Sequence, residues 1–254
     1  MKIIRLMHGI KKTGGRNNYG IITVPRKSLT KQLYRFLDTK RQAFPGVPAK
    51  ILNTVSSPHH TGNINLILYP NGVLTYILSP LLSISQEHIY NLHEPNNHID
   101  KGWSFFLNAL PLGTIIHNIE MVPGNGGQLS KAAGNNSLLL KKTKNTALIK
   151  LKSGAHRIIN PNCIATTGIV SNHNHFLKKL TKAGHSRLLG YRPHVRACSK
   201  NPVDHPLGGR TRGGIHPQNK NGLKVGTPTA KYKNKKLEVI SSRKYRLKRK
   251  YKKL

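Results

Sequence analysis

The residues best suited to acid–base chemistry are the adjacent Asp204 and His205. A histidine titrates near neutral pH and can act as a general acid or base, and the neighbouring carboxylate could orient its ring. The segment lacks a nucleophile and a predicted pocket, and the chain holds only 7 acidic residues, which are scattered. We therefore expect His205 to have a positioning role, and we predict no catalytic residue in this chain.

Metal and thiol chemistry have little support in the sequence. The 14 histidines show no ligand spacing with acidic or cysteine partners, and neighbours such as His59 and His60 rarely face one ion together. Cys163 and Cys198 are too few for a disulfide framework, and we expect a small buried residue and an incidental thiol. No metal site is predicted.

Positive charge is the dominant feature of the composition. The 254 residues include 43 Lys or Arg against 7 Asp or Glu, a formal net charge of +36. Such an excess repels itself unless a polyanion neutralises it. Nucleic acid is the favoured partner because phosphate contacts release condensed counterions, and an anionic membrane surface is the rival. No stretch reaches the roughly 20 apolar residues of a membrane span.

The charge is unevenly distributed along the chain. Lys and Arg number 11 in residues 1–41, 2 in 42–118, 12 in 119–195 and 18 in 196–254. We therefore predict four segments: a basic N-terminal arm, a near-neutral globular block, a second block, and a basic, Gly/Pro-rich C-terminal extension. The extension has too few apolar residues to fold alone. It is either a free solvated tail or a segment that becomes ordered on RNA.

The first globular block has the pattern of β structure. Residues 64–69 and 73–78 flank Asn71-Gly72, a strong hairpin signal because both turn residues tolerate positive φ. Residues 114–120 are a further strand candidate, and the polar residues 84–108 are interpreted as a long connection. A small five-strand barrel fits this pattern.

The second block predicts short strands at 137–140, 146–152, 156–159 and 163–167. Lys150 and Lys152 alternate with Ile149 and Leu151, which places basic side chains on one face of a second small barrel. Phe176, Leu177 and Leu180 form an apolar stripe at helical spacing, so residues 173–183 predict a helix that ends at Gly184.

Several phrases resemble the family of large-subunit ribosomal protein two, in register from about residue 12 to residue 214. They are Gly14–Thr23, Leu110–Leu129, Ser130–Gly134, Lys182–Arg187, Gly190–Arg196 and Asn201–Pro206 with Gly208-Gly209. The resemblance implies an oligonucleotide-binding-type barrel, then an SH3-like barrel, with basic arms threading ribosomal RNA. It implies a structural role near the peptidyl-transferase centre that supports subunit association, tRNA placement and peptide-bond formation, while the chemistry belongs to the RNA.

The implied partners are large-subunit rRNA, other ribosomal proteins and the small subunit across the interface. Magnesium would be bound mainly by RNA phosphates. The glycine-rich loop at 123–128 is suited to exposing backbone N–H groups to phosphates or to forming a tight turn between barrels, and both can be true; Arg16–Asn18 either contact RNA or form a surface turn. The predicted RNA-binding residues are Arg16, Asn17, Asn18, Gly124, Asn125, Gly126, Gly127, Gln128, Lys131, Lys182, Arg187, Arg192, Arg196, Asn201, Asp204, His205, Arg210, Arg212, Arg243, Lys244 and Arg246.

The sequence departs from the family pattern at three places. Leu207 stands where the family usually has a second histidine, arginines at 210 and 212 occupy a phrase in which an acid is common, and His60 replaces an arginine. An RNA contact at His60 is therefore expected to be weakened. The abundance of Lys, Asn and Ile predicts a mitochondrial ribosome, with the bacterial cytoplasm or a plastid as alternatives.

Two other functions remain as alternatives. A free single-strand-binding module would need an aromatic platform with basic residues on the first barrel, but that block has two Lys or Arg. An RNA-processing enzyme would need paired carboxylates or a metal site, which the scattered acids do not provide.

Overall fold

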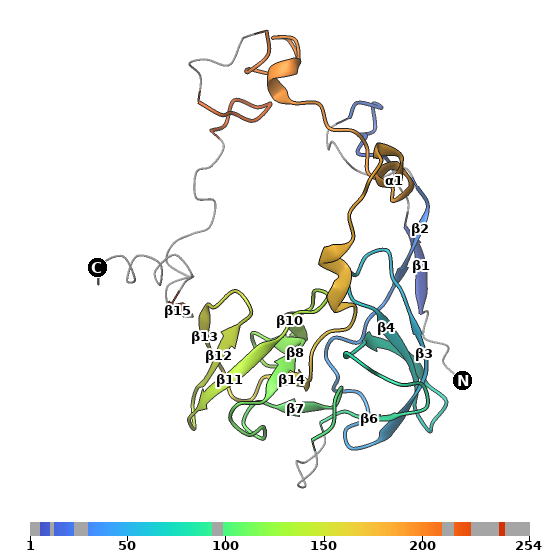
Figure 1. Cartoon of the computed structure of the whole chain (residues 1–254), viewed down its shortest axis with the longest axis vertical. Coiled ribbons are helices and arrows are strands. Elements are labelled where there is room, and N and C mark those ends of the chain that lie inside the picture. Colours follow the sequence, from blue (N-terminus) through green and yellow to red (C-terminus); the bar gives the residue numbers. More distant parts are fainter. Residues whose placement is uncertain are drawn as a thin grey trace. The chain divides into compact units, whose positions relative to one another are not determined.

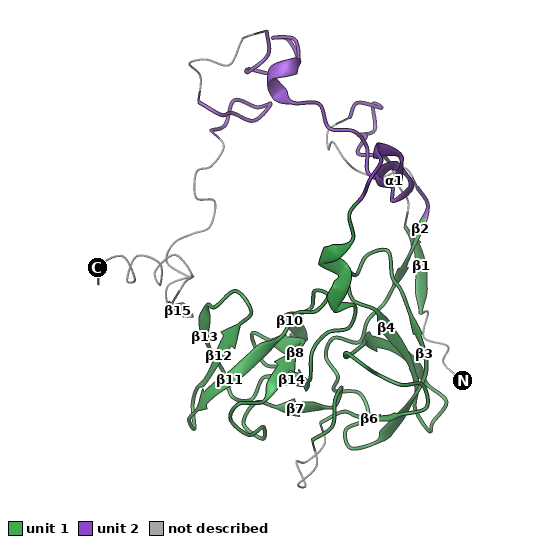
Figure 2. Ribbon diagram, in the orientation of Figure 1, with its two compact units in different colours: residues 1–10, 32–179, 236–254 green, residues 11–31, 180–235 purple. Residues whose placement is uncertain are grey.

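The computed structural model describes residues 6–10, 13–22, 30–92, 99–209, 216–224 and 239–241. The chain divides into two units (Figure 2): the first comprises residues 1–10, 32–179 and 236–254, and the second residues 11–31 and 180–235. All described strands belong to the first unit (Figure 1). The predicted mainly β fold is confirmed, and closure of the sheets into barrels stays a prediction.

A four-stranded antiparallel sheet has the order β5-β4-β3-β6. Its strands are β3 (Pro48–Val55), β4 (Ile64–Leu68), β5 (Leu74–Leu78) and β6 (His88–Tyr90). The predicted β4–β5 hairpin is confirmed, with Ile64 opposite Leu78. In its loop, Gly72 alone adopts positive φ, at 79°, and Asn71 Oδ1 accepts the N–H of Val73 at 3.1 Å. Asn71 thus stabilises the turn through its side chain and not through a left-handed backbone.

A seven-stranded sheet has the order β15-β13-β12-β11-β8-β14-β7. Its strands are β7 (Ser104–Phe106), β8 (Ile115–His117), β11 (Ser137–Lys142), β12 (Ala147–Leu151), β13 (His156–Ile159), β14 (Ile164–Thr167) and β15 (Val239–Ser241). Ile149 is buried and Lys150 exposed, as the alternation predicts. β7 and β8 precede residue 119, yet both pair with β14. The sheet therefore crosses the predicted boundary between the two blocks.

Two strand pairs lie outside these sheets. β1 (Met7–Ile10) pairs with β2 (Gln32–Arg35), and β9 (Ile119–Glu120) pairs with β10 (Gly127–Leu129), both antiparallel. Both β1 and β2 lie within the predicted N-terminal arm, so parts of this arm form a strand pair in the first unit.

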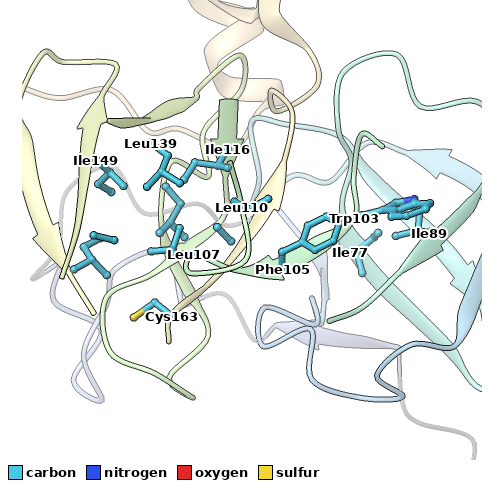
Figure 3. Close-up of a cluster of buried hydrophobic side chains, with 14 of the residues drawn as sticks. Ile77, Ile89, Trp103, Phe105, Leu107, Leu110, Ile116, Leu139, Ile149 and Cys163 are labelled. Atoms are coloured by element: carbon cyan, nitrogen blue, oxygen red, sulfur yellow. The ribbon is translucent and has the colours of Figure 1, made fainter. Parts of the chain in front are cut away.

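The interpretation of residues 84–108 as a connection was wrong. The segment contains β6 and β7, and it carries Trp103 and Phe105, which are 9% and 0% exposed. Trp103 packs edge-on against Tyr90, with ring centroids 4.6 Å apart. Figure 3 shows Trp103 with Ile77 and Ile89, and Phe105 between this group and the aliphatic residues of the other sheet. These two rings, hidden among polar neighbours in the sequence, join both sheets in one core.

The predicted helix at 173–183 was also wrong in its extent. A 3-10 helix, η1 (His173–Leu177), is followed by an extended stretch and then by α1 (Ala183–Leu188), and a second 3-10 turn is η2 (Ala197–Ser199). Phe176 is 79% exposed, so the apolar stripe that suggested the helix has no core to pack against, and a short unpacked helix is unstable. Gly184 lies inside α1, and Gly190, at φ 92°, follows its end. Within the described part of the chain, no helix has the length and apolarity needed to cross a membrane.

Arg41 is a buried cation that the sequence did not reveal. Its side chain is 1% exposed; Nε donates to Asn91 Oδ1 at 2.5 Å and a terminal nitrogen donates to the Gly102 carbonyl at 3.0 Å. Burial lowers the pKa of Arg41, against the opposing effects of Tyr69 and Asp38. Oxygens of neighbouring segments therefore solvate the guanidinium and fix the end of the N-terminal arm on the first unit.

His117 is a fully buried histidine in β8, opposite Thr166 of β14. Its Nδ1 lies 2.9 Å from the Gly168 carbonyl, which makes Nδ1 the protonated nitrogen of a neutral ring, and Nε2 is buried without a hydrogen-bond partner. Burial lowers the pKa of His117 to about 4; the Gly168 bond opposes this shift and the Arg41 charge adds to it.

This arrangement predicts acid sensitivity. Below the ordinary histidine pKa of 6.5, the unfolded chain binds a proton that folded His117 does not bind until the pH approaches about 4. The free energy of unfolding should therefore decrease as the pH is lowered from 6.5 to about 4, by up to about 3 kcal/mol. Urea unfolding from pH 7.5 to 4 should show a shallower loss for His117→Gln than for the wild type. The exposed His88→Gln variant is the control, and equal pH dependence in all three proteins would contradict the assignment.

Candidate nucleic-acid interface

The glycine-rich loop between β9 and β10 is closed by the buried carboxylate of Glu120. Its oxygens accept the N–H groups of Gly126 at 2.8 Å, Gly124 at 3.3 Å and Ile164 at 3.0 Å. The amides of Asn125 and Gly127 donate to the carbonyls of Val122 and Thr39. The prediction that these N–H groups are exposed for phosphates was therefore wrong. If RNA contacts this loop, the groups available to it are the exposed side chains of Asn125 and Gln128.

Close packing explains Gly126 and Gly127 better than phosphate binding does, whereas Gly124 has open space around its Cα and a positive φ of 81°. A Cβ on Gly127 would lie 2.1 Å from Asn118 Oδ1, and one on Gly126 would lie 2.7 Å from Thr39 Oγ1. The alternative interpretation as a tight turn thus accounts for both positions. The signal was present in the sequence, because Glu120 is the single acid of residues 119–195 and immediately precedes the loop.

The two cysteines differ in their surroundings. Cys163 is buried, and burial, followed by the charge of Glu120, raises the pKa of its thiol to about 11, which disfavours the thiolate. Cys198 is an exposed free thiol. Within the described ranges, no group of three or more His, Cys, Asp or Glu residues could hold a metal ion.

A surface of the first unit combines aromatic rings with a lysine. The ring of Tyr34 in β2 lies 5.3 Å from Phe36, 5.5 Å from His59 and 6.2 Å from His60, between centroids. Phe36 is 48% exposed. We call these four residues the aromatic surface. Flat, partly exposed rings are the groups on which unpaired RNA bases stack.

Lys131 provides the positive charge beside this surface. Burial lowers the pKa of His60, and the charges of Lys131 and His59 act in the same direction, so His60 is neutral at pH 7 and Lys131 lies near it. His60 Nδ1 is also 3.1 Å from the Ser57 hydroxyl. Burial lowers the pKa of half-buried Lys131, whose amine has no hydrogen bond or ion pair with the described residues. His60 replaces an arginine of the family pattern, and a weakened RNA contact was expected there. Lys131 nevertheless provides a positive charge near His60.

The second unit carries most of the other predicted cations. Lys182, Arg187 and Arg196 are exposed and Arg192 is half-buried, and none of their side chains is bonded to the described part of the chain. Asp204 is the sole acid within this unit's residues. Unpaired arginines in such surroundings suit phosphate binding.

The three residues Arg16–Asn18 have different roles in the turn that they form. Asn17 Oδ1 accepts the N–H groups of Tyr19 and Ile21, each at 3.0 Å, so Asn17 supports the turn, which was the alternative interpretation. Arg16 and Asn18 are exposed at its surface.

His205 is 9% exposed in a compact loop of residues 200–209. Its Nδ1 accepts the N–H of Leu207 at 3.1 Å, and its backbone N–H donates to the Asn201 carbonyl at 3.2 Å. The carboxylate of the exposed Asp204 has no hydrogen bond to His205 or to any other described residue. The idea that Asp204 orients the ring was therefore wrong, since a backbone amide does so. The predicted contacts at Arg210, Arg212, Arg243, Lys244 and Arg246 lie outside the described residues.

Comparison with known proteins identifies related sequences over most of the chain. Residues 3–85 match the family model "Ribosomal Proteins L2, RNA binding N-terminal domain", and residues 100–226 match "Ribosomal Proteins L2, C-terminal domain". A protein of Gluconobacter oxydans is 41% identical over 244 residues, which cover 93% of this chain and 86% of the relative. One of Granulibacter bethesdensis is 43% identical over 234 residues, covering 91% and 82%. Both relatives are named large ribosomal subunit protein uL2.

These relatives are bacterial. They give no support to the mitochondrial ribosome predicted from the composition, whereas the bacterial cytoplasm, one of its alternatives, fits them.

Lys131 and His60 provide a matched test of the first-unit surface. Lys131→Ala should weaken binding of the full chain to large-subunit rRNA about tenfold and lower the salt slope by about one, because one phosphate contact is lost. His60→Arg should do the opposite. Binding is measured over a series of salt concentrations, with the exposed Lys101→Ala as control. Unchanged affinity and slope in Lys131→Ala would exclude this contact.

Proposed function

Because this chain belongs to the ribosomal protein L2 family, we propose that it lies near the peptidyl-transferase centre and supports subunit association, tRNA placement and peptide-bond formation. The protein is a structural constituent of the large ribosomal subunit and binds rRNA. Its partners are rRNA and other ribosomal proteins, and contact with the small subunit belongs to the proposal. Magnesium at this interface would be held mainly by RNA phosphates.

The observation that carries the proposal is the set of unpaired cations on both units. Lys131 is half-buried without an anion, and Arg187, Arg192 and Arg196 have no partner in the described chain. Cations without acidic partners favour an external polyanion, and phosphates supply it with counterion release. The family resemblance of residues 201–209 supports the placement near the peptidyl-transferase centre.

We further propose that the protein does not itself catalyse a reaction. His205 uses Nδ1 to hold a backbone amide, Asp204 does not contact it, and Cys163 is a buried thiol of raised pKa. His205 would then fix the 200–209 loop against RNA, and peptide-bond chemistry would remain with the RNA.

Sedimentation tests the ribosomal assignment. In low magnesium, which separates the subunits, the full-length protein should comigrate with the large-subunit particle when it is followed by immunoblot. Treatment of the same lysate with ribonuclease should move it to light fractions, which is the control for RNA dependence. A protein found in light, RNA-free fractions without ribonuclease would contradict the assignment and favour a free RNA-binding module.

His205 variants separate positioning from proton transfer. In reconstituted particles, His205→Ala should slow peptide-bond formation by less than the roughly 100-fold typical of a lost general acid or base. His205→Asn should restore most of the rate, because its side-chain oxygen can accept the Leu207 N–H. The pH–rate profile should keep its shape in both variants. Loss of an ionisation from the profile in His205→Asn would instead indicate direct proton transfer.

A further inference from the structure

The second unit contains a pocket that is shaped by the end of α1. Gly190 follows the helix with φ at 92°, a left-handed conformation that favours glycine. Its N–H donates to the Arg187 carbonyl at 2.8 Å, and the next N–H, of Tyr191, donates to the Ser186 carbonyl at 2.9 Å. These two bonds form a Schellman motif, which satisfies the last helical carbonyls and reverses the chain. Residues 191–194 consequently pass beside the last turn of the helix.

The pocket is open to solvent, has a volume of about 340 Å³ and is lined by Ser186, Tyr191, Arg192, Pro193 and His194. This volume is at the lower end of the roughly 300–1,000 Å³ range of small-ligand sites. Tyr191 is 56% exposed, so its ring is accessible to a ligand. The side chains of Ser186, Arg192 and His194 make no hydrogen bond to the described residues, which leaves their polar atoms available.

The combination of side chains indicates the chemistry of the ligand. Tyr191 and Pro193 offer flat apolar faces, Ser186 and His194 offer hydrogen-bonding groups, and Arg192 offers a forked cation. An unpaired nucleotide presents the complementary groups: an aromatic base, polar base edges and a phosphate. The exposed Arg187 and Arg196 strengthen the preference for an anionic chain. An acidic peptide would satisfy the cations, but it would not use the rings.

We propose that this pocket holds one unpaired nucleotide of rRNA, with the base stacked on Tyr191, its edge bonded by Ser186 or His194, and a phosphate on Arg192. The proposal rests on the ribosomal function proposed above and adds a specific contact to it. Stacking is sequence-tolerant, because every base has an aromatic face, so Ser186 and His194 would provide any preference among bases.

Cross-linking in particles that carry the wild-type protein tests the proposal without a mutation. Ultraviolet irradiation followed by mass spectrometry should identify an rRNA nucleotide attached to Tyr191 or to a neighbouring pocket residue. Attachment of a peptide at these positions would overturn the proposal in favour of a protein partner. Absence of any nucleotide there, in particles whose protein cross-links to RNA elsewhere, would also overturn it.

Chemical probing of rRNA in particles carrying variants gives the second readout. Tyr191→Ala should leave the protein in the large-subunit fraction but make one nucleotide newly reactive at its base edge, whereas Tyr191→Phe should keep that nucleotide protected. In the full chain, loss of this stack should weaken binding to a single-stranded RNA containing the nucleotide about tenfold or more. Leu188→Ala, which alters an 80% exposed side chain outside the pocket lining, is the control.

Different results would contradict the proposed ribosomal function and the proposed nucleotide pocket. If wild-type protein does not sediment with the large subunit, the proposed function is wrong. If Tyr191→Ala protein sediments normally and the reactivity of every nucleotide matches the wild type, the ribosomal function stands and the nucleotide pocket is excluded.

Discussion

The hydrogen bonds that acidic side chains accept from backbone N–H groups are the constraint on which the rest of the structure depends. Glu120 accepts three backbone N–H groups, Asp38 Oδ1 accepts those of Lys40 and Arg41, and Glu87 accepts that of Ile84. In a chain with 43 basic and 7 acidic residues, this use has a direct electrostatic consequence. These carboxylates hold turns together, and even pairing all 7 acids with cations would leave a net charge of +36. The excess positive charge therefore favours a polyanionic partner.

The first unit joins both sheets in one core. Trp103 and Phe105 connect the aliphatic residues of the two sheets, and Arg41 secures the end of the N-terminal arm to the same body. Arg41 shows how a cation can be kept away from RNA: neutral oxygens surround it, and burial removes it from the surface. Lys131, in contrast, stays half-exposed and unpaired beside the aromatic surface. Position relative to the core thus decides which basic residues can meet phosphate.

Local patterns in the sequence predicted the strands and the β4–β5 hairpin well, because alternation and turn residues act over short distances. They failed where the outcome depends on distant partners. Lys131 and His60 approach each other across 71 positions of sequence, and Glu120 bonds to Ile164 across 44. The glycines at 124–127 were correctly recognised as a special loop, yet the sequence could not say whether its amides faced outward or met a carboxylate. The helix at 173–183 failed because an apolar stripe does not show whether a core exists to receive it.

The two units differ in what holds them together. None of the buried apolar side chains of the described chain belongs to residues 11–31 or 180–235. The second unit is instead built from local turns: the Asn17 turn, the Schellman motif at Gly190 and the loop around His205. Val203 and Leu188 are 96% and 80% exposed there. Turns of this kind define conformations but recover little of the entropy lost on ordering. Local hydrogen bonds, rather than burial of apolar side chains, therefore define the conformation of this unit. The first unit is thus stabilised by a buried apolar core, whereas the second unit depends on the turns and loops of its own chain segments.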